Sequence, residues 1–223
     1  MNIMVAVPCY DGKVCVETVR SLLNEQMVAA GAGVEFRAVF LPGCSLITHA
    51  RNQMASDFLA SEADRLVFID ADVSWEPGSL IRLASHPVDF VGGAYRLKQE
   101  PESYPVGWLE RPELWADPGT GLLEVACVPG GFLALSRKVF ERLADAHPTR
   151  TYTHYQFDGH AFFHAPIEGG RLYGEDTAFC YDWRAIGGQI WLDPELTLTH
   201  TGGSIPYAGR IGDWLRGRVA KAA

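Results

Sequence analysis

Blocks of apolar residues alternate with amphipathic stretches along the first hundred positions of the chain. Residues 3–7 and 66–69 are short, continuous apolar runs, which are typical of strands buried on both faces of a sheet. Residues 14–30 instead carry apolar side chains at helical spacing. The pattern also predicts a strand at 35–41, a helix at 47–60, a helix at 76–84 and a strand at 88–94. This order predicts an α/β domain whose central sheet is mostly parallel and flanked by helices.

The pattern becomes irregular in two long segments of the second half. Residues 95–121 are rich in Pro, Glu and aromatic residues, including Trp115. Residues 147–172 combine aromatic residues such as Tyr155 with His154, His160 and His164, whose spacing matches no zinc site. We expect loops in both, and loops of this length are usually functional. Around them the pattern predicts strands at 122–128 and 131–135, a helix at 136–146 capped by Ser136, a helix at 175–186, and strands at 189–192 and 196–200.

The composition is that of one globular domain. The chain has 223 residues, of which 48% are hydrophobic and 21% charged, so neither a disordered nor a fibrous chain is indicated. The net charge of −8 disfavours a general nucleic-acid-binding protein. Residues 204–223 are nevertheless locally basic. They could contact a phosphate or a membrane surface, or form a terminal helix with solvated basic side chains.

The cysteines and the N-terminal residues suggest in which cellular compartment the protein is found. The five cysteines are scattered and include no Cys-x-x-Cys pair, which favours reduced thiols over a disulfide framework or a cysteine zinc site. The first residues lack the basic region of a signal peptide, and no apolar run approaches the length of a membrane span. We therefore expect a cytoplasmic protein without a membrane span.

Asp70-Ala71-Asp72 directly follows the apolar run at 66–69. Ligands of open α/β sheets bind at the carboxyl ends of the strands, where these two acids are expected to lie. Neighbouring carboxylates repel each other unless a positive charge lies between them, and Mg²⁺ or Mn²⁺ binds carboxylate and phosphate oxygens together. The motif therefore suggests a metal-bound nucleotide, although a polar turn before the next helix would use the same residue types.

Further candidates for a site lie later in the chain or on the second predicted helix. Glu175 and Asp176 begin a predicted helix, where one could act as a general base or both could cap the helix. His200 ends a predicted strand and could be a metal ligand or a structural histidine. Arg51 could approach diphosphate oxygens or form a surface salt bridge. Gly130-Gly131 could allow a close backbone approach or form a bulge.

Six short motifs occur in an order that is more specific than any one of them. They are Val5-Ala6-Val7-Pro8-Cys9-Tyr10-Asp11, Ala50-Arg51-Asn52, Phe68-Ile69-Asp70-Ala71-Asp72, Pro129-Gly130-Gly131-Phe132, Gly174-Glu175-Asp176 and Leu198-Thr199-His200. Taken in this order, they resemble the GT-A glycosyltransferases, particularly the family 2-like bacterial and phage enzymes. The resemblance covers residues 1–203 and leaves 204–223 as a basic C-terminal tail.

The resemblance implies a single-domain GT-A fold and a metal-dependent transfer of sugar from a nucleotide-diphosphate donor to an acceptor hydroxyl. The acceptor would be a glycan, a protein or a modified small molecule. Asp72, with His200 and Asp70, would bind the Mn²⁺ or Mg²⁺ that bridges the diphosphate. The residues implied in binding the nucleotide sugar are Pro8, Tyr10, Asp11, Arg51, Asp70, Ala71 and Asp72, of which the first three would line the nucleobase pocket.

The same resemblance assigns the chemistry to the acidic pair. In inverting members a carboxylate deprotonates the acceptor hydroxyl, a role that would fall to Asp176, while Glu175 would position the donor sugar or the acceptor. A retaining reaction would not need Asp176 as a base. The short chain and the absence of a Gln-x-x-Arg-Trp signature favour transfer of a single sugar over processive synthesis.

Two other functions fit parts of the sequence. A nucleotidyltransferase that makes nucleotide sugars would share the α/β platform and a metal. It usually has a glycine-rich loop followed by basic residues where this chain has Pro8-Cys9-Tyr10-Asp11-Gly12-Lys13. A non-catalytic sugar-binding module would keep the aromatic segments but would not need the acids and His200 together. Those segments, at 95–120 and 147–172, are candidate acceptor surfaces or local core.

Overall fold

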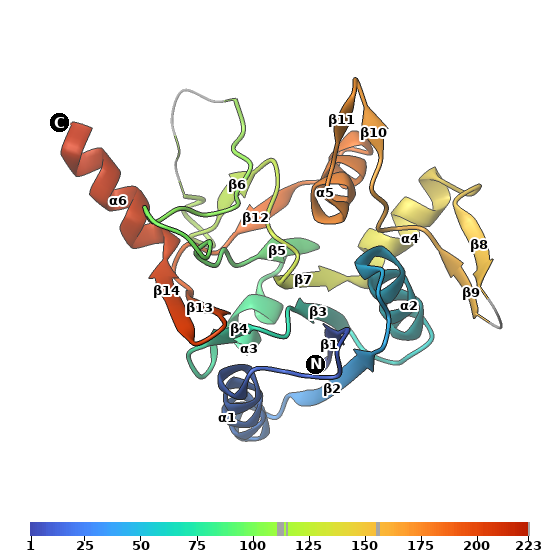
Figure 1. The fold of residues 1–223 in the computed structure, drawn as a ribbon, viewed down its shortest axis with the longest axis horizontal. Helices are drawn as coiled ribbons and strands as arrows, with labels where there is room; N and C mark the ends of the chain where they lie inside the picture. The colour runs from blue at the N-terminus through green and yellow to red at the C-terminus, as the bar shows by residue number, and fades with distance from the viewer. Residues whose placement is uncertain (111–113, 115, 155–156, 223) are drawn as a thin grey trace.

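A seven-stranded sheet forms the centre of the molecule (Figure 1), in the order β2-β1-β3-β7-β5-β12-β6. The computed structural model describes residues 1–110, 114, 116–154 and 157–222, so Trp115 and Tyr155 lie outside the described residues. The strands are β1 (Asn2–Cys9), β2 (Glu35–Pro42), β3 (Arg65–Ile69), β5 (Phe90–Gly92), β6 (Leu123–Val125), β7 (Phe132–Ser136) and β12 (Ile190–Leu192). β1 is parallel to β2 and β3, and β12 to β5, whereas β7 and β6 run antiparallel to their neighbours. The predicted mostly parallel sheet is confirmed.

Helices cover both faces of this sheet, as predicted. α2 (Ile47–Leu59), α4 (Arg137–Ala146) and α5 (Glu175–Ala185) pack on one face, and α1 (Val16–Ala32) and α3 (Ser79–Ser85) pack on the other. Successive residues of β1 alternate between the two cores, with Met4 in the first and Val5 in the second. Both faces of β1 are therefore buried, which explains why its sequence is a continuous apolar run.

A smaller sheet consists of β14 (Ile205–Arg210), β13 (Thr197–Gly202) and β4 (Val73–Trp75). β13 pairs with β14 along its whole length, and α6 (Ile211–Ala222) follows directly. Ile211 is fully buried in the main core. The expected boundary at residue 203 thus falls inside a hairpin, and the segment that follows it packs on the rest of the chain. Among the described residues, no helix has both the length and the apolar character that crossing a membrane requires.

Two hairpins occupy the segment at 147–172, where the sequence predicted a loop. β8 (Thr151–His154) pairs with β9 (Phe157–His160), and β10 (Ile167–Glu168) pairs with β11 (Arg171–Leu172). The loop prediction was wrong because these strands are short and half-buried or exposed, so they lack an alternating apolar pattern. Ser136 was also expected to cap α4, but its hydroxyl donates to Asp89 Oδ1 at 2.8 Å instead.

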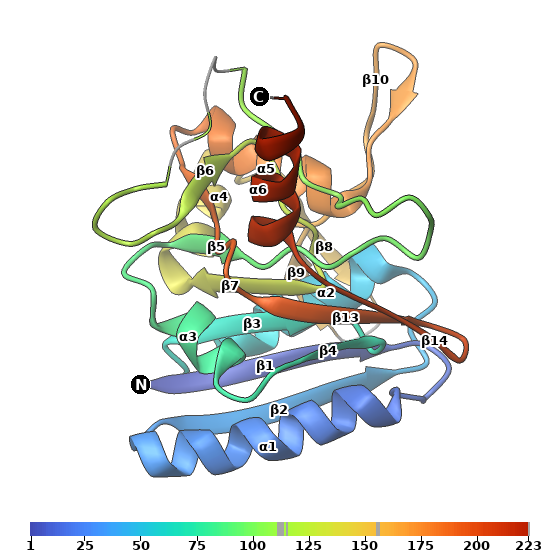
Figure 2. The same ribbon diagram turned by 90° about the vertical axis from the view of Figure 1, so that its left-hand side faces the viewer.

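α1 contacts the rest of the molecule through a polar face. It runs alongside β2 (Figure 2), and of the apolar side chains that predicted it, Val16, Leu23 and Met27 are exposed. Its buried residues include Thr18, Ser21 and Glu25. The spacing of apolar residues therefore predicted the helix correctly, although most of those residues are not the ones that it buries.

The buried face of α1 holds the segment that follows Asp72. The Ser21 hydroxyl donates to the Trp75 carbonyl at 2.9 Å and accepts from the Trp75 N–H at 3.0 Å. The fully buried carboxylate of Glu25 accepts from the indole N–H of Trp75 at 3.1 Å, and from the backbone N–H groups of Gly78 and Ile81 at 2.8 Å each. α1 thus fixes β4 and the start of α3 by hydrogen bonds.

Replacing Glu25 with alanine should lower the free energy of unfolding by at least about 3 kcal/mol, because three donors lose their acceptor and each buried unsatisfied donor costs about 1–3 kcal/mol. Urea denaturation followed by circular dichroism measures this change. Glu17→Ala, at an exposed position of the same helix, is the matched control and should change stability by less than about 0.5 kcal/mol. Equal effects of the two substitutions would contradict this account of α1.

Candidate active site

Two strand pairs bring Asp72 and His200 together, although they are far apart in the sequence. After β3, the Val73 N–H donates to the Asp70 carbonyl at 3.1 Å, which closes a turn into β4. β4 pairs with β13 so that Val73 lies opposite His200, and the Thr201 N–H donates to the Asp72 carbonyl at 2.8 Å. His200 Nε2 then lies 3.5 Å from Asp72 Oδ1. The Asp-x-Asp motif and the late histidine therefore meet at the carboxyl edge of β3.

The backbone sets the orientation of the His200 ring. His200 Nδ1 lies 3.2 Å from the carbonyl oxygen of Arg96, and because a carbonyl only accepts, we place the proton on Nδ1. Nε2 then faces the Asp72 carboxylate, to which it donates a hydrogen bond when it carries a proton and beside which it can coordinate a cation when it does not. A carboxylate and a deprotonated Nε2 both offer lone pairs to a cation between them, and metal-binding histidines usually donate their other N–H to a carbonyl or a carboxylate. The pair therefore has the chemistry of a cation site.

Lys98 supplies a positive charge at this position. Its ammonium binds Asp72 Oδ2, while His200 lies at the other carboxylate oxygen. The lysine stem passes over Gly202, where an added Cβ would lie 3.1 Å from Lys98 Cδ. Burial raises the pKa of Asp72, but the contacts with His200 and Lys98 outweigh this effect and lower the pKa to about 2. Asp72 is therefore ionised at neutral pH.

Asp70 belongs to a buried cluster beside this pair. Its Oδ1 accepts a hydrogen bond from Arg51 Nη2 at 3.0 Å, and its Oδ2 accepts one from the Tyr95 hydroxyl at 3.2 Å. Arg51 is 3% exposed, and its Nη1 lies 3.8 Å from Glu175 Oε1. Burial lowers the pKa of Arg51, but the charges of Asp70, Glu175 and Asp176 outweigh it and raise the pKa. The cluster thus connects the acids that begin α5 with the Asp-x-Asp motif.

Two consecutive glycines make room for this cluster. A Cβ at Gly130 would overlap Arg51 Nη1 and lie 2.6 Å from its Cζ, and a Cβ at Gly131 would lie 2.5 Å from Asp70 Cγ. The Gly131 carbonyl also accepts a hydrogen bond from the Asp70 N–H at 3.1 Å. Of the two roles that the sequence left open for this glycine pair, the structure shows the close backbone approach.

A cleft of about 760 Å³ contains most of the residues expected to bind a nucleotide sugar. Its lining includes Pro8, Asp11, Asp70, Ala71, Asp72 and His200. Tyr10 is not part of the lining that the structure describes, and its side chain is 65% exposed. Arg51, Glu175 and Asp176 are also outside that lining, and contacts of Arg51 connect them to Asp70.

A metal ion would find only part of the expected ligand set. Within the described residues, no group of three or more His, Cys, Asp or Glu side chains is arranged to hold a metal. Both oxygens of Asp70 accept hydrogen bonds from Arg51 and Tyr95. Asp72 and His200 fit a cation that takes its other ligands from phosphate oxygens and water, as Mg²⁺ usually does.

Tyr95 and Lys98 are site residues that the sequence did not indicate. Both lie in the segment predicted as an irregular loop, and neither belongs to a motif or to a periodic pattern. Tyr95 contacts both halves of the site, because its hydroxyl binds Asp70 and its ring centroid lies 4.6 Å from that of His200. Their proximity to the acids arises from the folded course of the loop, which leaves no signal in the local sequence.

Comparisons with known proteins show the fold. No protein-family model and no curated protein sequence matches the chain. The crystal structure of GalNAc-T7 with UDP, GalNAc and Mn²⁺ aligns with 90% of the chain, at a TM-score of 0.52 and 14% sequence identity. The chain spans less than half of that protein, covering 44% of its length. The expected GT-A type of α/β fold is thereby confirmed.

A second solved structure is less similar. Glucosyl-3-phosphoglycerate synthase from Mycobacterium tuberculosis, in complex with phosphoglyceric acid, is 19% identical and aligns with 62% of this chain and 57% of its own. Its TM-score of 0.33 is too low to show a common fold.

Gly130→Ala should lower the free energy of unfolding by roughly 1–3 kcal/mol or more, the usual cost of overpacking, because the new methyl group displaces a buried guanidinium from Asp70. Urea denaturation measures the loss. Gly31→Ala is the matched control, since an added Cβ there meets nothing within 4 Å and alanine favours the helix. If Gly130→Ala were as stable as Gly31→Ala, the close approach to Arg51 would be refuted.

Proposed function

We propose that this protein is a metal-dependent glycosyltransferase that moves one sugar from a nucleotide-diphosphate donor to an acceptor hydroxyl, with inversion at the anomeric carbon. The observation that carries the proposal is the pairing of Asp72 Oδ1 with Nε2 of His200 at the carboxyl edge of β3. Ligands of α/β sheets bind at this edge. The GalNAc-T7 structure, which shares the fold, contains UDP and Mn²⁺.

Asp72 and His200 would hold Mn²⁺ or Mg²⁺ together with the donor diphosphate. When bound, such a cation offsets the negative charge that develops on the departing nucleoside diphosphate. Asp72 is ionised, and because the Arg96 carbonyl lies beside Nδ1 of His200, Nε2 is the ring nitrogen that would coordinate the cation. Pro8 and Asp11, which also line the cleft, would contact the nucleobase.

Lys98 would act on the same diphosphate. Its ammonium binds Asp72 directly, and its side chain is one-third exposed, so it can turn toward a phosphate when a cation takes its place. Arg51 is buried and bonded to Asp70, and we assign to it the placement of that carboxylate. Each oxygen of Asp70 keeps a second lone pair, which can accept a hydrogen bond from a ribose hydroxyl.

Asp176 would remove the proton from the attacking hydroxyl. Its charge acts on both Arg51 and Tyr95, which supports a position beside the Asp70 cluster, and its Oδ1 accepts the Thr177 N–H at 2.7 Å. The carboxylate would take the proton as the acceptor oxygen attacks the anomeric carbon opposite the departing diphosphate. Glu175 would position the donor sugar or the acceptor through its contact with Arg51.

Metal-dependent stabilisation by a nucleotide tests the proposal, because a ligand that binds the native state raises the unfolding temperature. We expect one of UDP, GDP, CDP or dTDP to raise the Tm in Mn²⁺ or Mg²⁺, and EDTA to abolish the rise. Asp72→Ala should lose the metal-dependent rise and keep its fold. The control is Asp145→Ala, at an exposed position of α4. An unchanged rise in Asp72→Ala would refute the site, and no rise with any nucleotide would favour a non-catalytic sugar-binding module.

Lys98→Met should tighten the binding of Mn²⁺ to the nucleotide-free protein, because the ammonium and the metal ion compete for Asp72. We expect roughly a fivefold lower Kd, since unit charges at about 4 Å interact by about 1 kcal/mol in water. Electron paramagnetic resonance of free Mn²⁺ measures this Kd. The matched control is Lys138→Met, which removes an exposed lysine of α4 that is paired with Asp89. An unchanged or weaker Mn²⁺ affinity in Lys98→Met would contradict the competition.

A further inference from the structure

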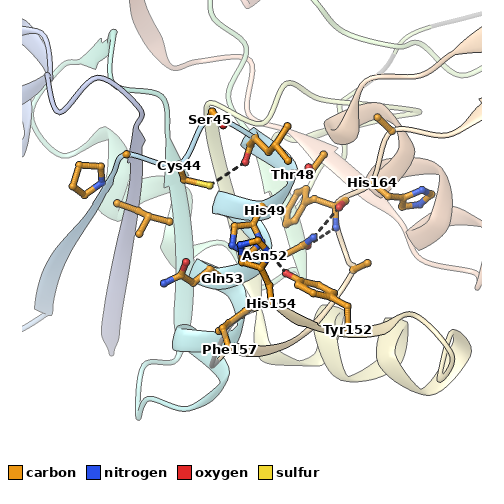
Figure 3. A pocket seen from close by; sticks show the side chains of 17 residues that line it. Cys44, Ser45, Thr48, His49, Asn52, Gln53, Tyr152, His154, Phe157 and His164 are labelled. Atoms are coloured by element: carbon orange, nitrogen blue, oxygen red, sulfur yellow. Dashed lines mark hydrogen bonds between the residues drawn. The ribbon is translucent and has the colours of Figure 1, made fainter.

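A larger cleft, of about 970 Å³, lies between α2 and the β8–β9 hairpin (Figure 3). One wall comes from the loop after β2 and the first half of α2, and it presents Ser45, Thr48 and Gln53. The other wall comes from the hairpin, which contributes Tyr152 and Phe157. None of the residues that were given a role in the proposed function lines this cleft. Its volume is typical of a small-molecule site.

Rings from the two walls meet inside the cleft. The His49 ring centroid lies 4.4 Å from that of His154, and 6.0 Å from those of Tyr152 and Phe157. The planes of these pairs are inclined by 54° to 89°. Two rings that sandwich a flat nucleobase would be parallel, and none of these three pairs is. The inclined rings instead present single faces and edges beside hydroxyl and amide groups.

The lining of this cleft carries no permanent charge. The 17 described residues that line it include no Asp, Glu, Lys or Arg. Burial and the neighbouring His154 lower the pKa of His49, so His49 is neutral at pH 7. His164 also lines the cleft, and its Nε2 already lies 2.8 Å from the Asp182 carboxylate. A phosphate, a carboxylate or an ammonium group would find no Asp, Glu, Lys or Arg in this lining, and its desolvation would be unfavourable. The ligand that fits is neutral, with apolar faces and several hydroxyl groups.

We propose that this cleft binds a neutral saccharide, at a site separate from the cleft at Asp72. The apolar C–H face of a sugar ring packs on an aromatic face, here on Phe157 or Tyr152. Its hydroxyl groups exchange hydrogen bonds with Ser45, Thr48 and Gln53. This binding of a saccharide does not depend on the proposed function.

The cleft adjoins the acidic cluster through α2. Arg51 points to Asp70, and the next residue, Asn52, lines the cleft. The Asn52 side chain donates to the Phe163 carbonyl at 2.9 Å and accepts from the Phe163 N–H at 2.7 Å. The Phe163 ring also lines the cleft, and Arg51 Cζ lies 5.8 Å from its centroid. One layer of side chains therefore separates a bound saccharide from the cluster that includes Glu175.

Saturation-transfer difference NMR on the full chain tests this proposal, with maltose, cellobiose, lactose and N,N′-diacetylchitobiose as millimolar probes in EDTA and without nucleotide. We expect at least one disaccharide to receive saturation. Phe157→Ala should weaken its Kd by about fivefold, since an aromatic contact contributes about 0.5–1.5 kcal/mol. Gln53→Ala should weaken it as well, and it decides the matter if Phe157→Ala does not fold. Tyr181→Ala, which removes an exposed ring on α5 outside the cleft, is the matched control and should bind as the unmodified protein does.

The proposal is overturned if none of the four disaccharides receives saturation, or if the cleft substitutions weaken binding no more than Tyr181→Ala does. It is also overturned if Phe157→Ala loses nucleotide stabilisation and keeps disaccharide binding, because the cleft would then hold the donor base. Asp72→Ala separates the two proposals: it should lose nucleotide stabilisation and bind the disaccharide normally. Disaccharide binding without any nucleotide effect would leave the cleft as a sugar site and refute the glycosyltransferase.

Discussion

A guanidinium that is removed from water needs negative partners. Arg51 is buried at the centre of the molecule, so negative groups have to surround it there. Its charge is balanced by Asp70 at 3.0 Å and by Glu175 at 3.8 Å. Its Cζ also lies 5.6 Å from the Phe68 ring centroid and 5.8 Å from that of Phe163. Breaking a buried ion pair costs about 3–5 kcal/mol. The end of β3, the start of α5 and the middle of α2 are therefore held in one arrangement.

Hydrogen-bonded carboxylates extend this arrangement to the rest of the site. Glu25 fixes the segment between β4 and α3, and Asp193 fixes the segment between β12 and β13. The fully buried Asp193 accepts hydrogen bonds from Arg82 at 2.7 and 3.2 Å, and His86 Nε2 lies 2.8 Å from it. Burial raises the pKa of Asp193, but the His86 and Arg82 contacts outweigh it and lower the pKa to about 2. Because β13 follows this anchored turn, His200 is placed by polar contacts far from its own ring.

The two clefts differ in charge in a way that suits two different substrates. The cleft at Asp72 is lined by Asp11, Lys13 and Glu17 as well as by the Asp-x-Asp acids. The carboxylates suit a divalent cation, and Lys13 is an opposite charge for a phosphate. The described lining of the cleft between α2 and the β8–β9 hairpin includes no Asp, Glu, Lys or Arg. Electrostatics would therefore favour a charged ligand in the first cleft and a neutral ligand in the second.

The sequence by itself determined most of the alternation of strands and helices in the first hundred residues and the edge where Asp70 and Asp72 lie. A strand buried on both faces appears as a continuous apolar run, and the last residue of the run marks the carboxyl end of the strand. Asp70 and Asp72 follow such a run, so their place at that edge could be predicted. Only the tertiary structure decided that β7 runs antiparallel between β3 and β5, that β13 brings His200 to Asp72, that Lys98 reaches the same carboxylate, and that α1 buries a polar face. The neutral cleft and its two walls were decided there as well. Each of these features joins residues that are distant along the chain, and a contact between distant residues leaves no periodic trace in either local sequence.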